Sequence, residues 1–209
     1  MRKLLTVCVA VAMSMILAHT ADAGRFGIKA GTNVTSLDFK AGMPPTLGYS
    51  AGLTWQWDLP LGFALQPDLV YHVKASRLSD VTYDTFGLGY VELPLNVQWG
   101  LRFADRNIRL FAQASPFVGY AVAQTGGMEN IVEKIDNWTN INRFSYGAGL
   151  GLGVQLWALQ VTAQYTWHLG QLADVKDVAL SDFNDRNFGG YVISVALLLG
   201  KKDKNNKNK

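Results

Sequence analysis

Apolar and polar residues alternate along eight stretches of the chain with a period of two. In the clearest stretch, Leu47–Asp58, every second residue from Leu47 to Trp57 is apolar and the residues between are small or polar. Side chains of a β-strand point alternately to opposite faces, so this period predicts strands with one apolar face. The predicted strands are Arg25–Thr35, Leu47–Asp58, Leu61–Lys74, Phe86–Leu101, Ile108–Ala123, Arg143–Leu156, Ala158–Leu169 and Phe188–Gly200.

The segments between these strands alternate between long and short. The long ones are 36–46, 75–85, 124–142 and 170–187, and the short ones are 58–61, 102–107 and the region of Trp157. Barrels of the outer membrane have short periplasmic turns and longer external loops. The sequence therefore predicts an all-β fold: an eight-stranded antiparallel up-and-down transmembrane β-barrel, with four long loops outside the cell.

Two prolines interrupt the alternation in the third and fourth predicted strands. Proline has no backbone N–H and removes one hydrogen bond from a ladder. We therefore expect a bulge or a strand end at Pro67 and at Pro94.

The residue types on the two faces indicate which face meets lipid. The non-apolar face consists largely of Gly, Ala, Ser, Thr and Gln, which fit inside eight strands, whereas a soluble protein places Lys and Glu on its exposed surface. Aromatic residues near strand ends predict two interfacial belts. The belt residues are Trp55, Trp57 and Trp99 toward the short turns, and Tyr71, Tyr120, Tyr146 and Trp167 toward the long loops. The alternative is a soluble periplasmic ligand-binding barrel or sandwich with these aromatics in its core.

Composition divides the chain into three parts. Residues 1–23 have a basic start, an apolar run and a small-residue cleavage signal, and they predict a cleavable signal peptide that contains Cys8, the one cysteine. Residues 24–200 form the predicted outer-membrane barrel domain, and residues 201–209 a disordered Lys-rich periplasmic tail. Of the formal net charge of +3, the first part carries +1 and the tail +4, which leaves −2 for the barrel. A nucleic-acid partner would require a basic face on the barrel and is not expected.

Five charged residues project into the predicted lumen. A charge left unpaired there costs several kcal/mol, so we expect ion pairs. The fourth and fifth strands are neighbours, which makes Glu92–Arg109 the expected pair, with Lys29 able to join it. The sequence thus predicts a plug of salt bridges, and the alternative is a small channel whose ion path uses the same charges. The five residues are Lys29, Asp68, Lys74, Glu92 and Arg109.

An outer-membrane hydrolase is the alternative from another class. His72 and His168 both point inward near the loop ends, and a hydrolase needs a nucleophile beside a histidine that a carboxylate orients. No such triad can be read from the spacing, so we expect no catalysis. No metal-ligand spacing and no phosphate-binding glycine loop is present, so neither a metal nor a cofactor is expected.

Four short motifs carry a resemblance to a known family. They are Gly27-Ile28-Lys29-Ala30-Gly31-Thr32-Asn33, Tyr90-Val91-Glu92-Leu93-Pro94-Leu95, Pro116-Phe117-Val118-Gly119-Tyr120 and Gly147-Ala148-Gly149-Leu150-Gly151. In this order they resemble the PorT-like outer-membrane β-barrel family, over nearly the whole chain after residue 23. The resemblance implies an eight-stranded porin-like barrel in the Gram-negative cell envelope. The chain departs from the family pattern at Lys201–Lys209, because family members commonly stop at an aromatic strand terminus.

The function expected from these observations is a structural or binding role without catalysis in the cell outer membrane. Outer-membrane lipid surrounds the predicted barrel, and the external loops would contact an extracellular or envelope partner. Trp138 and Phe183 are the candidate contact residues in the two longest loops.

Overall fold

The computed structural model describes residues 24–36, 45–77, 85–103, 107–125, 143–169 and 189–200. No helix in these ranges is long and apolar enough to cross a membrane. The described residues form eight strands and one turn of 3-10 helix, η1 (Pro60–Gly62). The strands are β1 (Arg25–Ser36), β2 (Thr46–Asp58), β3 (Phe63–Arg77), β4 (Thr85–Phe103), β5 (Ile108–Thr125), β6 (Phe144–Leu156), β7 (Leu159–Leu169) and β8 (Gly189–Leu199).

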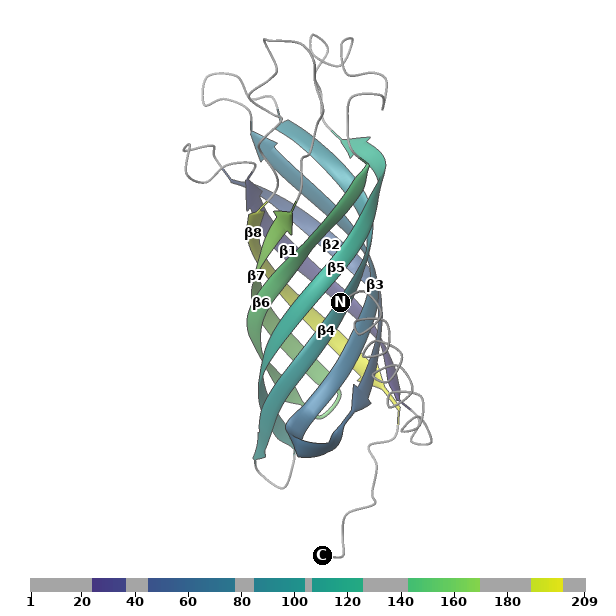
Figure 1. The fold of residues 1–209 in the computed structure, drawn as a ribbon, viewed down its shortest axis with the longest axis vertical. Helices are drawn as coiled ribbons and strands as arrows, with labels where there is room; N and C mark the ends of the chain where they lie inside the picture. Colours follow the sequence, from purple (N-terminus) through teal and green to yellow (C-terminus); the bar gives the residue numbers. More distant parts are fainter. Residues whose placement is uncertain are drawn as a thin grey trace, which may run out of the picture.

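The strands form a closed antiparallel barrel in which each strand pairs with its sequence neighbours (Figure 1). β1 also pairs with β8, from Phe26 opposite Leu199 to Ser36 opposite Gly189, so the sheet has no free edge. Closure satisfies the backbone groups that an open sheet would leave unpaired in lipid. The predicted eight-stranded up-and-down barrel is therefore confirmed.

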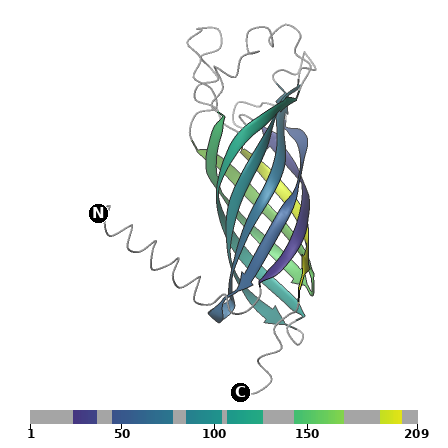
Figure 2. The same cartoon turned by 90° about the vertical axis from the view of Figure 1, so that its right-hand side faces the viewer.

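The two ends of the barrel differ in the lengths of their connections. At one end, which we call the short-turn end, the strands are joined by residues 59–62, 104–107 and 157–158. At the other, the long-loop end, they are joined by residues 37–45, 78–84, 126–143 and 170–188. The strands run between these ends with a pronounced tilt, and both views show β1 beginning and β8 ending at the short-turn end (Figures 1 and 2).

The outer face of the barrel is apolar and the inner face is mostly polar. Outward side chains such as Ile28 and Leu152 are 55% and 68% exposed, whereas inward Gln66 and Gln98 are fully buried. A soluble barrel has the opposite arrangement, with its apolar side chains inside. The alternative of a soluble ligand-binding barrel is therefore wrong.

The backbone departs from two expectations about strand boundaries and bulges. β3 begins at Phe63 and not at Leu61, because Leu61 (φ 60°) and Gly62 (φ 83°) adopt left-handed conformations in η1. The prolines do not shift the register: the pairs on both sides of Pro67 and Pro94 keep one alignment, and neither strand ends there. A missing N–H removes a hydrogen bond without adding a residue, so it need not produce a bulge. In the ladders of the described residues, the register shifts instead between Gly89 and Tyr90.

Glycines on β6 make room for aromatic side chains inside the barrel. A Cβ atom built on Gly147 would lie 2.5 Å from the Phe117 ring, and one on Gly153 would lie 2.3 Å from the Phe111 ring. Both phenylalanines are buried in the lumen. Glycine at these positions therefore leaves space inside the barrel for the two rings.

Candidate functional site: a polar network inside the barrel

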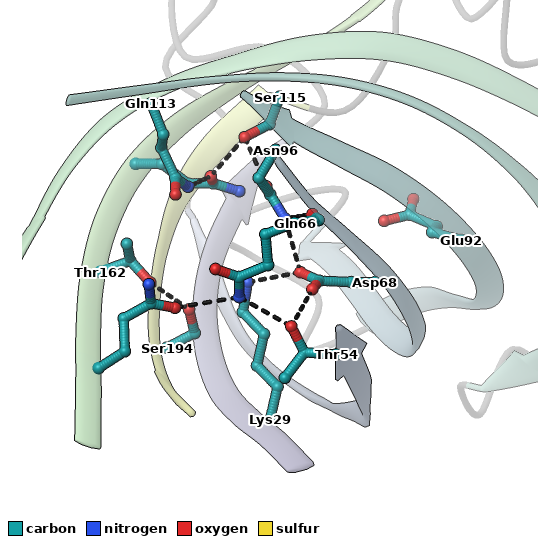
Figure 3. A network of polar contacts seen from close by, with 12 residues as sticks. Lys29, Thr54, Gln66, Asp68, Glu92, Asn96, Gln113, Ser115, Thr162 and Ser194 are labelled. Carbon is teal, nitrogen blue, oxygen red and sulfur yellow. Dashed lines mark hydrogen bonds and ion pairs between the residues drawn. The ribbon is translucent and has the colours of Figure 1, made fainter. Parts of the chain in front are cut away.

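A buried carboxylate lies at the centre of the lumen. Lys29 Nζ donates to Asp68 Oδ2 at 2.7 Å, and Thr54 Oγ1 donates to Asp68 Oδ1 at 2.5 Å. Asn96 Nδ2 donates to Oδ2 at 2.8 Å. Asp68 therefore accepts hydrogen bonds from residues on three other strands, β1, β2 and β4, which converge on it in Figure 3. These donors replace the water that an ionised carboxylate loses on burial.

Amide side chains extend this network across the lumen. Gln66 Nε2 on β3 donates to Gln160 Oε1 on β7 at 3.0 Å. Gln98 Nε2 donates to Gln66 Oε1 at 2.8 Å, so one glutamine links two others. Gln113 Nε2 on β5 donates to Gln164 Oε1 on β7 at 2.6 Å. Because the Gln66–Gln160 and Gln113–Gln164 bonds join strands that are not neighbours, side chains occupy the middle of the barrel.

A second cluster lies closer to the long-loop end. Glu92 forms an ion pair with Lys74, and His72 Nδ1 lies 2.8 Å from Glu92 Oε2. Lys74 Nζ also contacts His168 Nε2, and it lies 5.2 Å from the ring centroids of both Tyr90 and Phe117. Lys74 is therefore enclosed by one carboxylate, one imidazole and two aromatic rings. The carboxylate and the ring faces favour its ammonium group.

A third cluster lies at the short-turn end. Asp58 Oδ2 accepts from Arg102 at 2.8 Å and from Arg25 at 3.3 Å, and Asp58 Oδ1 accepts from Gln56 at 3.0 Å. Arg109 is 2% exposed, and it donates to the neutral oxygens Gln98 Oε1 at 2.7 Å and Gly62 O at 3.2 Å.

All five charged residues predicted for the lumen lie inside the barrel, but one predicted pair is wrong. Glu92 stands opposite Gly119 of β5, whereas Arg109 stands ten residues away on β5, opposite Arg102. At about 3.3 Å per residue, Glu92 and Arg109 are separated by roughly 33 Å along the strand. Lys29 does not join Glu92 either, because it binds Asp68. Facing the same lumen does not place two residues at the same height.

The predicted belt residues lie on the outer face, and all except Tyr71, which lies near the middle of β3, are within five residues of the strand end assigned to them. Most are more than 40% exposed, and Trp57 and Tyr71 are half-buried. Tyr165 adds to the long-loop belt, because its ring lies 4.8 Å from that of Trp167 and 4.9 Å from that of Tyr191. Trp138 and Phe183 lie outside the described residues.

Sequence reasoning left three charged residues of the cluster at the short-turn end out of the predicted network, although it included Arg109. Arg25 has the same parity as Lys29 on β1, Asp58 the same parity as Thr54 on β2, and Arg102 the same parity as Gln98 on β4. The period of two was therefore sufficient to place all three in the lumen. Among the described residues, no group of three or more His, Cys, Asp or Glu side chains could hold a metal ion.

A closed barrel with an apolar outer face, aromatic belts and a polar interior defines an integral membrane β-barrel. Residues 21–174 match the family model described as "Outer membrane protein beta-barrel domain". The chain belongs to this family and is a protein of the cell outer membrane.

Solved structures with similar folds share little sequence with the chain. The outer membrane enzyme PagL superposes with a TM-score of 0.51 at 15% identity, covering 83% of this chain and 99% of its own. Neisserial surface protein A gives a TM-score of 0.49 at 11% identity, covering 84% and 97%. A major outer membrane protein from Thermus thermophilus gives 0.45 at 12% identity, covering 85% and 100%. At this identity, the likeness to PagL shows a common fold only. No curated protein matches the sequence.

Proposed function

We propose that the protein has a structural or binding role in the outer membrane, exerted through its long connections, with a closed lumen and no catalysis. The observation that carries this proposal is the hydrogen bond from Gln66 on β3 to Gln160 on β7, which crosses the interior. Eight strands leave an interior that side chains just fill. An ion could pass only if these buried hydrogen bonds broke.

Conductance of the full chain in a planar lipid bilayer tests the closed lumen. The wild type should give no steady open events. The double variant Gln66→Ala, Gln160→Ala removes the crossing and should give ion conduction. A matched control, Leu152→Ala with Ile193→Ala, truncates two outward side chains and should remain silent. Steady open events in the wild type would contradict the proposal and favour the small channel.

The absence of catalysis is supported by the surroundings of the histidines. His72 Nδ1 contacts Glu92, as the base of a triad would, but its Nε2 atom is buried and has no hydrogen-bond partner among the described residues. A triad requires a nucleophile at that position. His168 contacts Lys74, which forms an ion pair with Glu92, and it packs against Phe117. These contacts favour a structural role for both histidines over the hydrolase alternative.

We also propose a finer classification and orientation. The order of the four glycine- and proline-containing motifs supports a place with the PorT-like barrels. The length difference between the two ends supports a periplasmic short-turn end and an external long-loop end.

Removal of residues 1–23 as a signal peptide would give a mature chain that begins at Gly24, and the mass of the protein from outer membranes tests this. The variants Trp138→Cys and Phe183→Cys each place one cysteine in a long connection. This cysteine should react with an impermeant thiol reagent on intact cells if the long connections face outward.

A further inference from the structure

The charges inside the barrel do not balance at the short-turn end. The described ranges contain three acidic residues, and two of them have one basic lysine partner each: Asp68 binds Lys29, and Glu92 binds Lys74. The third, Asp58, is shared by Arg25 and Arg102. Arg109 forms no ion pair with a carboxylate among the described residues. Among the described residues, three arginines thus share one carboxylate at this end, an excess of two positive charges.

The positions of two arginines sharpen this imbalance. Arg102 on β4 and Arg109 on β5 stand directly opposite each other in the ladder, where like charges destabilise a sheet. Asp58 attracts the guanidinium of Arg109 electrostatically, whereas the guanidiniums of Arg102 and Arg25 repel it. The Nε atom of Arg109 is buried and has no hydrogen-bond partner in the described part of the chain. A buried guanidinium with an unused donor, beside a second guanidinium, is costly unless an anion lies between them.

We propose that Arg102 and Arg109, together with Arg25, form a binding site for a phosphate group at the short-turn end of the lumen. Guanidinium groups bind phosphate through parallel charge-assisted hydrogen bonds. A phosphate monoanion or dianion carries about one to two negative charges at neutral pH, comparable with the excess of positive charge among the described residues of this end. This site goes beyond the proposed structural or binding role, since it lies at the end opposite the long connections.

The site is accessible from one side. The Asp58 and Arg102 side chains are 36% and 25% exposed, whereas Arg109 lies deeper at 2%. A Cβ atom built on Gly200 would lie 3.4 Å from Arg25 Cγ, so β8 ends beside this site. The phosphate could be free or could belong to a lipid headgroup, because the short-turn end also borders the membrane.

Binding of inorganic phosphate by the folded full chain tests the proposal. Calorimetric titration in zwitterionic detergent at fixed ionic strength should show saturable binding. Arg102→Gln should weaken it at least about tenfold, since it removes a charge-assisted hydrogen bond. Arg143→Gln, which changes an arginine that packs on the Tyr120 ring near the opposite end, should leave it unchanged. Asp58→Asn removes the competing carboxylate and should tighten binding severalfold, an effect that misfolding cannot produce.

A second arm separates the two sources of phosphate. Mass spectrometry of the protein released from nanodiscs should show retained phosphatidylglycerol, lost in Arg102→Gln, if the headgroup is the ligand, and none if free phosphate is. The absence of both saturable phosphate binding and retained phosphatidylglycerol would overturn the proposal. The variant Asp105→Asn tests whether a carboxylate of the β4–β5 connection already serves as the anion. If phosphate binds to this variant and not to the wild type, the Asp105 carboxylate is the anion of the site, and the proposal is overturned.

Discussion

Lys29 on β1 and Asp68 on β3 form an ion pair inside the lumen, with 2.7 Å between Nζ and Oδ2. The two strands are separated in the sheet by β2. Because β1 and β3 share no ladder, this contact belongs to the side-chain network and not to the sheet. Asp68→Asn would leave Lys29 without a counter-ion in the interior. We expect a loss of about 3–5 kcal/mol in the free energy of unfolding, measured by urea titration in lipid vesicles.

A double-mutant cycle separates the pair from other effects of the substitution. The variant Lys29→Gln, Asp68→Asn removes both charges and should recover most of the stability that Asp68→Asn loses, because no unpaired charge remains. Additive losses in the double variant would show that the pair is not coupled.

Gly153 and Phe111 predict a second coupling, based on volume. The Cβ atom of Gly153→Ala would lie 2.3 Å from the Phe111 ring and 2.7 Å from Thr162 Cγ2. Overpacking of this kind costs about 1–3 kcal/mol of unfolding free energy. Phe111→Leu shortens the opposing side chain, so the alanine should be less destabilising in that background.

Gly149→Ala is the matched control on the same strand. The nearest neighbour of its Cβ atom would be Thr166 Cγ2, at 3.2 Å, so only a small adjustment is required. We expect a clearly smaller loss than for Gly153→Ala. Equal losses for the two alanines would indicate a general glycine effect and contradict the packing argument.

The outward tryptophans predict direct contact with lipid. Trp55, Trp99 and Trp167 are 43–50% exposed on the outer face, near the barrel ends. Single-tryptophan variants that retain one of these residues should lose fluorescence in vesicles of brominated lipid, most strongly when bromine lies close to the headgroups. A tryptophan placed at Phe117, inside the lumen, should be quenched far less. Equal quenching of the interior residue would contradict the orientation of the faces.

The sequence predicted the barrel better than the contacts inside it, for a physical reason. Lipid imposes an apolar residue at every second position, so strands such as Leu47–Asp58 can be recognised without partners. Parity also placed Lys29, Asp68 and Glu92 in the lumen. It contains no information on height along the barrel axis, which depends on the register of every intervening ladder.

The partner of Glu92 shows what register adds. From β3, Lys74 reaches the height of Glu92, whereas Arg109 of the neighbouring strand β5 lies far toward the short-turn end. In a narrow lumen, strands that do not share a ladder can still exchange side-chain contacts, as Gln66 and Gln160 do. Adjacency of strands was therefore not sufficient to predict ion pairs: β3 and β5 both neighbour β4, but only β3 places a basic residue at the height of Glu92.

Substitution of His168 distinguishes a structural histidine from a catalytic one. His168 packs edge-on against Phe117, with 4.9 Å between ring centroids, and contacts Lys74. His168→Ala should lower the free energy of unfolding, because truncation of a buried side chain leaves a cavity and Lys74 loses a contact. Hydrolysis of lipid esters and of peptides should be at the background rate in both the wild type and this variant. His72→Ala serves as the second arm, since His72 contacts Glu92 on the other side. Turnover above background in the wild type that disappears in either variant, while the barrel remains folded, would establish a catalytic histidine and contradict the structural role.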